Sequence, residues 1–111
     1  MDNYQKFIAL SRYARHIDGE DRRETWEESV SRLIDFYADH VMEATGDTQT
    51  RAAINMLQPY IEDLKVMPSM RALMTAGPAL DRDHVAAYNC AYIAVDDARA
   101  FDEAMYILMC G

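Results

Sequence analysis

The first part of the chain carries apolar residues three or four positions apart, the spacing that gathers side chains on one face of a helix. The first such run predicts a helix of roughly four turns that stops near Asp18 and Gly19. Its predicted inward-facing residues are Phe7, Leu10, Ala14 and Ile17.

A second run, over residues 22–45, has the most regular stripe and predicts the longest uninterrupted helix. Thr25 and Glu28 have the spacing of a capping box, and Gly46 has the position of a glycine that ends a helix. The side chains predicted to face the core are those of Trp26, Val30, Leu33, Ile34, Tyr37 and Val41.

A third helix is predicted from about residue 48 to residue 64. Pro59 lies inside this run and should kink or split the helix, because its ring clashes with a carbonyl of the preceding turn. The side chains predicted to face inward are those of Ala53, Met56, Leu57, Tyr60, Ile61 and Leu64.

The pattern changes at Val66. Residues 66–83 contain two prolines and a glycine, so short helical turns and loops are expected there. Residues 90–95, CAYIAV, are predicted to form a short strand because they are rich in aromatic and β-branched side chains. Asp96 or Asp97 is then expected to cap a last helix. The apolar face of that helix consists of Phe101, Met105, Leu108 and Met109.

The last helix closes the sequence without a basic residue in its final turn, where a cation would offset the negative end of the helix dipole. Chain ends are usually polar, whereas this one is apolar as far as Cys110 and Gly111. We therefore expect the chain to be a segment of a larger protein, whose other parts complete the core against this helix.

Composition limits the possible functions. With 111 residues the chain has room for one small domain. Its formal net charge of −8 argues against a nucleic-acid partner, because phosphate backbones repel an acidic surface. No apolar run approaches the roughly 18 residues of a membrane span, and the N-terminal sequence MDNYQKF lacks the features of a signal peptide. Its two cysteines are therefore expected to be thiols in the cytoplasm.

Most other polar residues have an ordinary structural interpretation. The acidic groups at 27–28, 81–83 and 96–97 are interpreted as helix caps and solvated faces, since acid/base catalysis needs a shared cleft. Arg22 and Arg23 could bind an anion. Three histidines lie far apart in the sequence without the short spacing of metal ligands, so no metal site is expected. They are His16, His40 and His84.

Two positions leave functional alternatives open. Ser69 follows Pro68 at the start of a helical turn, where its hydroxyl and the backbone N–H groups either bind a phosphate or cap the helix. Cys90 follows Asn89 at the start of the predicted strand, so it is either a buried packing residue or a thiol presented to a cleft. Cys110, on the apolar last helix, is expected to pack like a small hydrophobic residue.

The segments VMPSMRALMTAGPAL, YNCAYIAV and RAFDEAMYILMCG follow one another over residues 66–111. This order resembles the start of the catalytic barrel of ribonucleotide reductases, and RYARHIDGEDRRETWEESVSRLIDFY resembles the helical leader of that family. The similarity is greatest to the adenosylcobalamin-dependent class in its monomeric, triphosphate-reducing form, as found in bacteria and their viruses.

The resemblance implies a fold that is mainly α in this segment. A helical leader over residues 1–65 would be followed, over residues 66–111, by the first strand and helices of an incomplete ten-stranded α/β reductase barrel. In the family the last helix leads into a Gly-Thr-Gly-Val-Gly loop, and Gly111 matches its first glycine.

The implied activity replaces the 2′-hydroxyl of a ribonucleoside triphosphate with hydrogen. The implied cofactor is adenosylcobalamin, bound mainly by the remainder of the enzyme, whose cobalt–carbon bond breaks to generate a thiyl radical. A separate cysteine pair supplies two electrons and becomes a disulfide. Cys90 matches the first member of this pair, and its partner lies outside the chain.

The resemblance also assigns substrate contacts. Pro68 and Ser69 match the segment that meets the substrate phosphates, and Asn89 lies beside the nucleotide. Ala91 departs from the bulkier or polar residues of relatives, which leaves the local contacts there open. The implied partners are the triphosphate substrate, the C-terminal remainder of the reductase and a thioredoxin-like dithiol reductant, in a bacterial cell or a virus-infected host.

A different interpretation remains open. The chain would then be a free-standing acidic helical module without catalysis, which binds a partner protein through the apolar face near Met105 and Met109.

Overall fold

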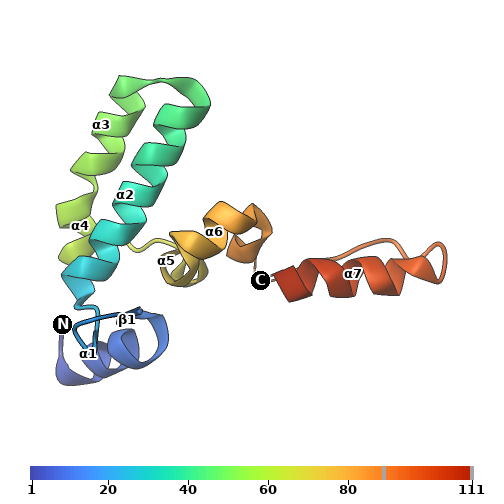
Figure 1. The fold of residues 1–111 in the computed structure, drawn as a ribbon, viewed down its shortest axis with the longest axis horizontal. Helices are drawn as coiled ribbons and strands as arrows, with labels where there is room; N and C mark the ends of the chain where they lie inside the picture. The colour runs from blue at the N-terminus through green and yellow to red at the C-terminus, as the bar shows by residue number, and fades with distance from the viewer. Residues whose placement is uncertain (89, 111) are drawn as a thin grey trace.

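The computed structural model describes residues 1–88 and 90–110, with side chains as far as Met109, and confirms the prediction of a mainly helical segment. In Figure 1 the second and third α-helices form an upright hairpin, the first lies below it, and the last extends away at the opposite end. The elements are α1 (Asn3–Ile8), η1 (Ala9–Tyr13), β1 (His16–Ile17), β2 (Arg22–Arg23), α2 (Trp26–Thr45), α3 (Thr48–Met56), α4 (Gln58–Glu62), α5 (Met70–Thr75), α6 (Pro78–Arg82), η2 (His84–Ala87) and α7 (Arg99–Cys110).

Helix α2 is the longest helix of the described chain, as predicted. The Thr25 hydroxyl accepts a hydrogen bond from the Glu28 N–H, while the Glu28 carboxylate accepts one from the Thr25 N–H at 2.7 Å. Gly46 ends the helix with a φ of +68°, a left-handed conformation that favours glycine. The helix begins at Trp26 rather than at residue 22 because Arg22 belongs to β2.

The prediction of a first helix ending near Gly19 is wrong. Helical structure begins earlier, at Asn3, where Asp2 and Gln5 form a capping box. It ends at Tyr13 after a π-helical turn, and Ile17 pairs with Arg22 across an antiparallel hairpin. Two of the residues predicted to face inward, Phe7 and Leu10, are exposed.

The predicted split near Pro59 is confirmed, since α3 ends at Met56 and α4 begins at Gln58. The predicted inward face is largely wrong. Ile61 is buried and Ile54 packs against the core, whereas Met56 and Tyr60 are exposed. The reason is that this pair of helices presents apolar residues on two sides, and α2 covers only the side of Ile54 and Ile61.

The buried core lies between α2, α4 and the short helices after residue 66, and Leu73 on α5 and Val30 on α2 are its most completely buried large side chains. Packing therefore crosses the division at residues 65 and 66 that the sequence predicts, and that division stays a prediction. The buried cluster consists of Val30, Leu33, Ile34, Ile61, Ala72, Leu73, Ala76, Leu80 and Ala86.

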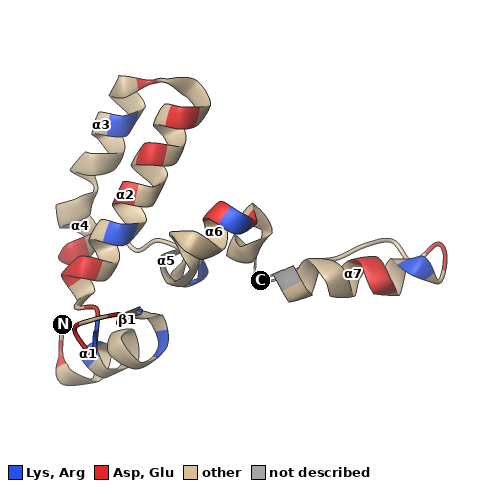
Figure 2. Ribbon diagram, viewed as in Figure 1, with Lys and Arg blue, Asp and Glu red and all other residues tan. Residues whose placement is uncertain are grey.

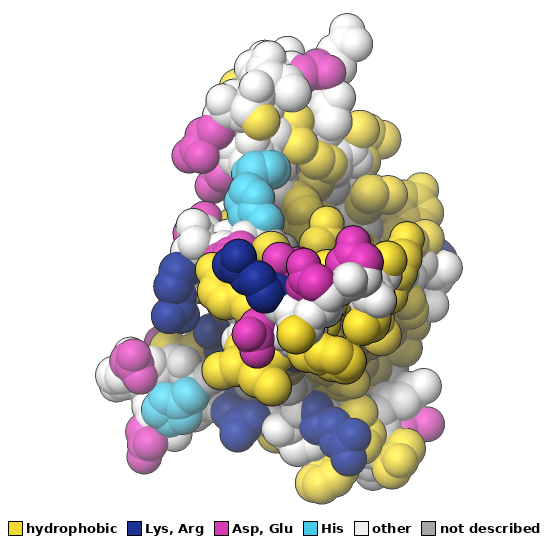
Figure 3. Space-filling view, turned by 90° about the vertical axis from the view of Figure 1, so that its right-hand side faces the viewer, with side chains coloured by type: hydrophobic (Ala, Val, Ile, Leu, Met, Phe, Trp, Pro, Cys, Tyr) yellow, Lys and Arg dark blue, Asp and Glu magenta, His cyan; other side chains and the backbone are white. Residues whose placement is uncertain are grey.

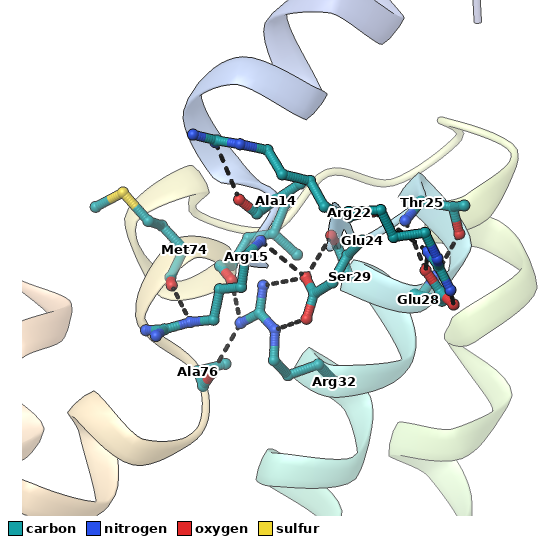
Figure 4. Close-up of polar contacts among 12 residues, drawn as sticks. Ala14, Arg15, Arg22, Glu24, Thr25, Glu28, Ser29, Arg32, Met74 and Ala76 are labelled. Atoms are coloured by element: carbon teal, nitrogen blue, oxygen red, sulfur yellow. Dashed lines mark hydrogen bonds and ion pairs between the residues drawn. The ribbon is translucent and has the colours of Figure 1, made fainter. Parts of the chain in front are cut away.

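A partly buried ion pair between Glu24 and Arg32 lies where α2 meets the end of α5 (Figure 4). The Arg32 guanidinium donates to both Glu24 carboxylate oxygens at 2.9 and 3.0 Å. It also donates to the carbonyl oxygens of Leu73 at 2.8 Å and Ala76 at 2.7 Å. Glu24 in turn accepts from the Arg15 N–H at 3.2 Å. The Arg32 guanidinium thus connects three parts of the chain: the β1–β2 hairpin through Glu24, α2 and α5. It can do so because its several N–H groups point in fixed directions.

The same contacts set the protonation of Glu24. Burial of the carboxylate raises its pKa, but hydrogen bonds from Arg32, the Arg15 N–H and Ser29 act in the opposite direction and lower the pKa below the usual 4.5. The Glu24 carboxylate is therefore ionised at neutral pH and can form the ion pair with Arg32.

Residues 90–95 do not form the predicted strand in the described chain. A strand is stable only when another strand takes up its backbone hydrogen bonds, and no described segment pairs with these residues. The last helix, α7, starts where expected, because the Asp97 carboxylate accepts a hydrogen bond from the Arg99 N–H at 2.7 Å. Within the described residues, no helix combines the length and the apolar character needed to cross a membrane.

Replacing Leu33 by Ala should lower the free energy of unfolding by about 2–4 kcal/mol, because a buried leucine leaves a cavity when it is truncated. The matched change, Leu57→Ala, removes a side chain that is 44% exposed and should cost less than about 1 kcal/mol. Urea denaturation of both variants measures the difference. Equal losses would show that Leu33 does not lie in the core.

Glu24→Gln should reduce stability at neutral pH and flatten its acid dependence. Because the pKa of Glu24 is lower in the folded chain, its ionised form stabilises the fold above the unfolded pKa, and this contribution is lost as the pH falls through the folded pKa. As the pH is lowered below the usual glutamate pKa of 4.5, the melting temperature of the wild type should therefore fall more steeply than that of the variant. The exposed residue Glu43 supplies the control: Glu43→Gln should keep the wild-type slope.

Candidate functional site

The thiol of Cys90 is free and exposed. It stands in a stretch without helix or strand that follows η2, and the side chain of Tyr92 in the same stretch is 98% exposed. The interpretation of Cys90 as a buried packing residue is therefore wrong. Its exposure leaves the thiol accessible to a substrate, a second thiol or an oxidant.

Ser69 caps α5. Its hydroxyl accepts a hydrogen bond from the Ala72 N–H at 3.4 Å, as a helix-capping serine does. The side chain is still exposed, so the hydroxyl can donate its own hydrogen to a further partner, and Pro68 beside it is half-buried. Capping is thus its structural role, and phosphate contact stays a prediction.

A hydrogen bond joins the two segments that carry the candidate site. Arg71, two residues after Ser69, donates from Nε to the Ala86 carbonyl oxygen at 3.0 Å. Cys90 follows Ala86 by four residues, which span at most about 14 Å even when fully extended. The fold therefore keeps the beginning of α5 and the Cys90 segment in one region of the molecule.

Two further sequence predictions lie outside the described residues. Asn89, expected beside the nucleotide, is one of them, and the side chain of Cys110, expected to pack among apolar neighbours, is the other.

The fold brings together two histidines that the sequence separates. The rings of His40 on α2 and His84 on η2 meet edge to face, with centroids 4.9 Å apart, and Phe36 stacks on His40. Among the described side chains, however, no group of three or more His, Cys, Asp and Glu residues is arranged to hold a metal ion. The contact fastens η2 to α2.

Arg22 and Arg23, considered as anion ligands, are occupied within the chain. Arg22 donates to Glu28 and Glu20, and Arg23 donates to three backbone carbonyls of the first helical segment. The hydrogen bond from Arg22 is the main reason that the pKa of Glu28 is lowered to about 2. Figure 2 shows the basic residues spread over several elements, with acidic ones frequent along α2.

One carboxylate of each acidic group caps a helix, in agreement with the prediction of helix caps and solvated faces. Glu28 completes the capping box of α2, Asp83 accepts from the Val85 N–H at 3.0 Å, and Asp97 caps α7.

Two adjoining cavities beside Trp26 were not predicted. One has a volume of about 500 Å³ and the other about 410 Å³, and Met1, Ala9 and Trp26 line both. The Trp26 ring is held in place because its Nε1–H donates to the Glu62 carbonyl oxygen at 3.3 Å. The sequence signal that could have indicated them is a tryptophan in the first position of α2 together with Met67 and Met70.

Comparisons of the chain with protein-family models, with curated proteins and with solved structures found no match.

Because Cys90 is exposed, its thiol should react in the native protein at a rate comparable with that of a free cysteine. A colourimetric aromatic disulfide reagent measures this rate at neutral pH. Cys90→Ser should remove the fast phase, and the reactivity that remains then belongs to Cys110. Protection of Cys90 until the chain unfolds would contradict the exposed position.

Proposed function

We propose that the chain is the N-terminal segment of an adenosylcobalamin-dependent ribonucleoside-triphosphate reductase. The sequence order described above is the basis for this proposal. The observation that supports it best is the exposure of the Cys90 thiol, since a cysteine that reduces a substrate must reach both the substrate and a second thiol.

The proposed reaction uses Cys90 as one of two electron donors. Overall, two thiols and one ribonucleotide give a disulfide, a 2′-deoxyribonucleotide and water. Each thiol loses one electron and one proton, and the 2′-hydroxyl leaves as water. The second thiol belongs to the remainder of the enzyme.

The other residues of the chain would bind the substrate. Ser69 would meet the triphosphate with its hydroxyl, next to Pro68, and Asn89 would lie beside the nucleotide. The hydrogen bond from Arg71 to Ala86 supports this arrangement, because it keeps the Ser69 turn close to the segment that leads to Cys90.

The radical that starts the reaction would come from adenosylcobalamin, which would bind mainly to the remainder of the enzyme. The cavities described beside Trp26 are lined by residues that the resemblance does not assign to the cofactor. The chain alone should therefore not reduce nucleotides with adenosylcobalamin and a dithiol.

A second function, that of a non-catalytic interaction module, is favoured by the surface of α7. Five large apolar side chains of this helix are more than half exposed: Phe101, Met105, Tyr106, Leu108 and Met109. The coding sequence downstream separates the two proposals. A continuation that begins Thr-Gly-Val-Gly and later supplies a thiyl cysteine with Asn and Glu nearby supports the reductase, and its absence supports the module.

In the full-length enzyme, one turnover without external dithiol should leave Cys90 in a disulfide with a downstream cysteine. Peptide mass analysis after a single turnover identifies the pair. Cys90→Ser should abolish sustained turnover, because a hydroxyl cannot supply the electrons.

Cys110→Ala is the matched control for this experiment, and it should retain turnover at a cost mainly in stability. If Cys90 is still a free thiol after turnover, its proposed role is wrong.

A further inference from the structure

The two cavities beside Trp26 adjoin and together form a groove, here called the Trp26 groove, with an apolar half and a polar half. Among the described residues no charged side chain lines the apolar half, where Met67 and Met70 lie. Lys6, Glu27 and Glu62 line the polar half. Their volumes of about 410 and 500 Å³ are typical of small-molecule sites. The hydrophobic side chains of α7 gather on another face, at the other end of the molecule (Figures 1 and 3), and line neither half.

Two uncommon backbone conformations form walls of the Trp26 groove. Leu64, which lines the apolar half, has a φ of +61°, a left-handed conformation that residues with a bulky side chain rarely adopt. It occurs where α4 ends, and the N–H groups of Lys65 and Val66 donate to the Tyr60 carbonyl oxygen at 2.9 and 3.3 Å. Ala9, which lines both halves, begins the π-helical turn η1. Because unusual backbone conformations of both kinds cluster at functional sites, they favour a binding role for the groove.

The charges of the polar half favour a cationic ligand. Glu24 lines this half, but its carboxylate is already paired with Arg32. Within the described part of the chain, Glu27, Glu62 and Lys6 take part in no ion pair. Two carboxylates without an ion-pair partner therefore line this half together with one side-chain ammonium group, and the carboxylates attract a cation.

Trp26 lies at the junction of the two halves, since it lines both. Its Nε1–H donates to the Glu62 carbonyl oxygen at 3.3 Å, so the ring is held beside a residue that supplies one of the two carboxylates. A protonated amine over the face of an indole ring is attracted by the ring as well as by the carboxylates. An apolar body joined to that amine would lie against Met67 and Met70, whose flexible side chains adapt to irregular shapes.

We propose that the Trp26 groove binds a small organic cation that consists of a primary ammonium group and an aromatic or branched apolar body. The ammonium group pairs with Glu27 and Glu62, and the body occupies the apolar half. The proposal does not rest on the reductase function, because Pro68, Ser69 and Cys90 do not line the groove. Its failure would therefore leave that function untouched.

Phenethylamine is the probe, because it joins a primary ammonium group to a phenyl ring. Its titration into the 111-residue chain should shift the NMR signals of the Nε1–H of Trp26, the only tryptophan, and of the methyl groups of Met67 and Met70. A ligand of this size should bind with a dissociation constant on the order of 1 mM. Neutral phenethyl alcohol and anionic phenylpropionate should bind at least about fivefold more weakly, because they lack the charge-assisted hydrogen bonds.

Glu27→Gln and Glu62→Gln each remove one negative charge and keep the size of the side chain. Each should weaken the binding of phenethylamine at least about threefold and leave that of phenethyl alcohol unchanged. Lys6→Gln should strengthen the binding of phenethylamine about twofold, because it removes a like charge. Met67→Ala, in the apolar half, should weaken the binding of the amine and the alcohol to the same extent.

Glu43→Gln is the matched control, because Glu43 is exposed near the far end of α2 and does not line the groove. It should bind phenethylamine like the wild type. Circular dichroism verifies that each variant is folded, and if one glutamine variant in the groove fails to fold, the other decides. The proposal is overturned if phenethylamine causes no saturable shift at Trp26, if the alcohol or phenylpropionate binds as tightly as the amine, or if a folded Glu27→Gln or Glu62→Gln variant binds the amine like the wild type.

Discussion

The arrangement of the molecule depends on the guanidinium of Arg32. Its N–H groups donate hydrogen bonds to the Glu24 carboxylate and to the carbonyl oxygens of Leu73 and Ala76. A single side chain therefore joins the end of the β1–β2 hairpin, α2 and the last turn of α5. The ends of short helices carry carbonyl groups without partners inside the helix, and here a cation takes them up. Because the pair is only slightly exposed, removal of either partner would leave a charge poorly solvated and unpaired.

Local signals explain which parts of the fold could be predicted from the sequence. The capping box at Thr25, the left-handed glycine at Gly46 and the break beside Pro59 each depend on a few neighbouring residues, and the structure has all three. The hairpin over residues 15–24 could not be predicted in this way. It is held by the contacts of Glu24 with Arg15 and Arg32, and the partners of Arg32 lie about forty residues further along the chain.

The candidate site was predicted in part. The exposure of Cys90 could not be read from its neighbours, since CAYIAV has the composition of a buried strand, and burial depends on a pairing partner that the described chain does not supply. The contact between His40 and His84 and the groove beside Trp26 also arise only when distant segments meet. Ser69 was the simplest position, because a serine before a helical turn caps it whatever else it binds.

The way α7 is attached has a consequence for local stability. Residues 90–98 connect it to the body without helix or strand, most of their side chains are exposed, and α7 itself packs mainly against η2. The body, by contrast, is tied together by the Arg32 contacts and the buried cluster around Leu73. Detaching α7 therefore breaks few interactions, whereas opening α2 breaks many, so amide hydrogens in α7 should exchange long before those of α2. The chain behaves energetically as two units of unequal stability.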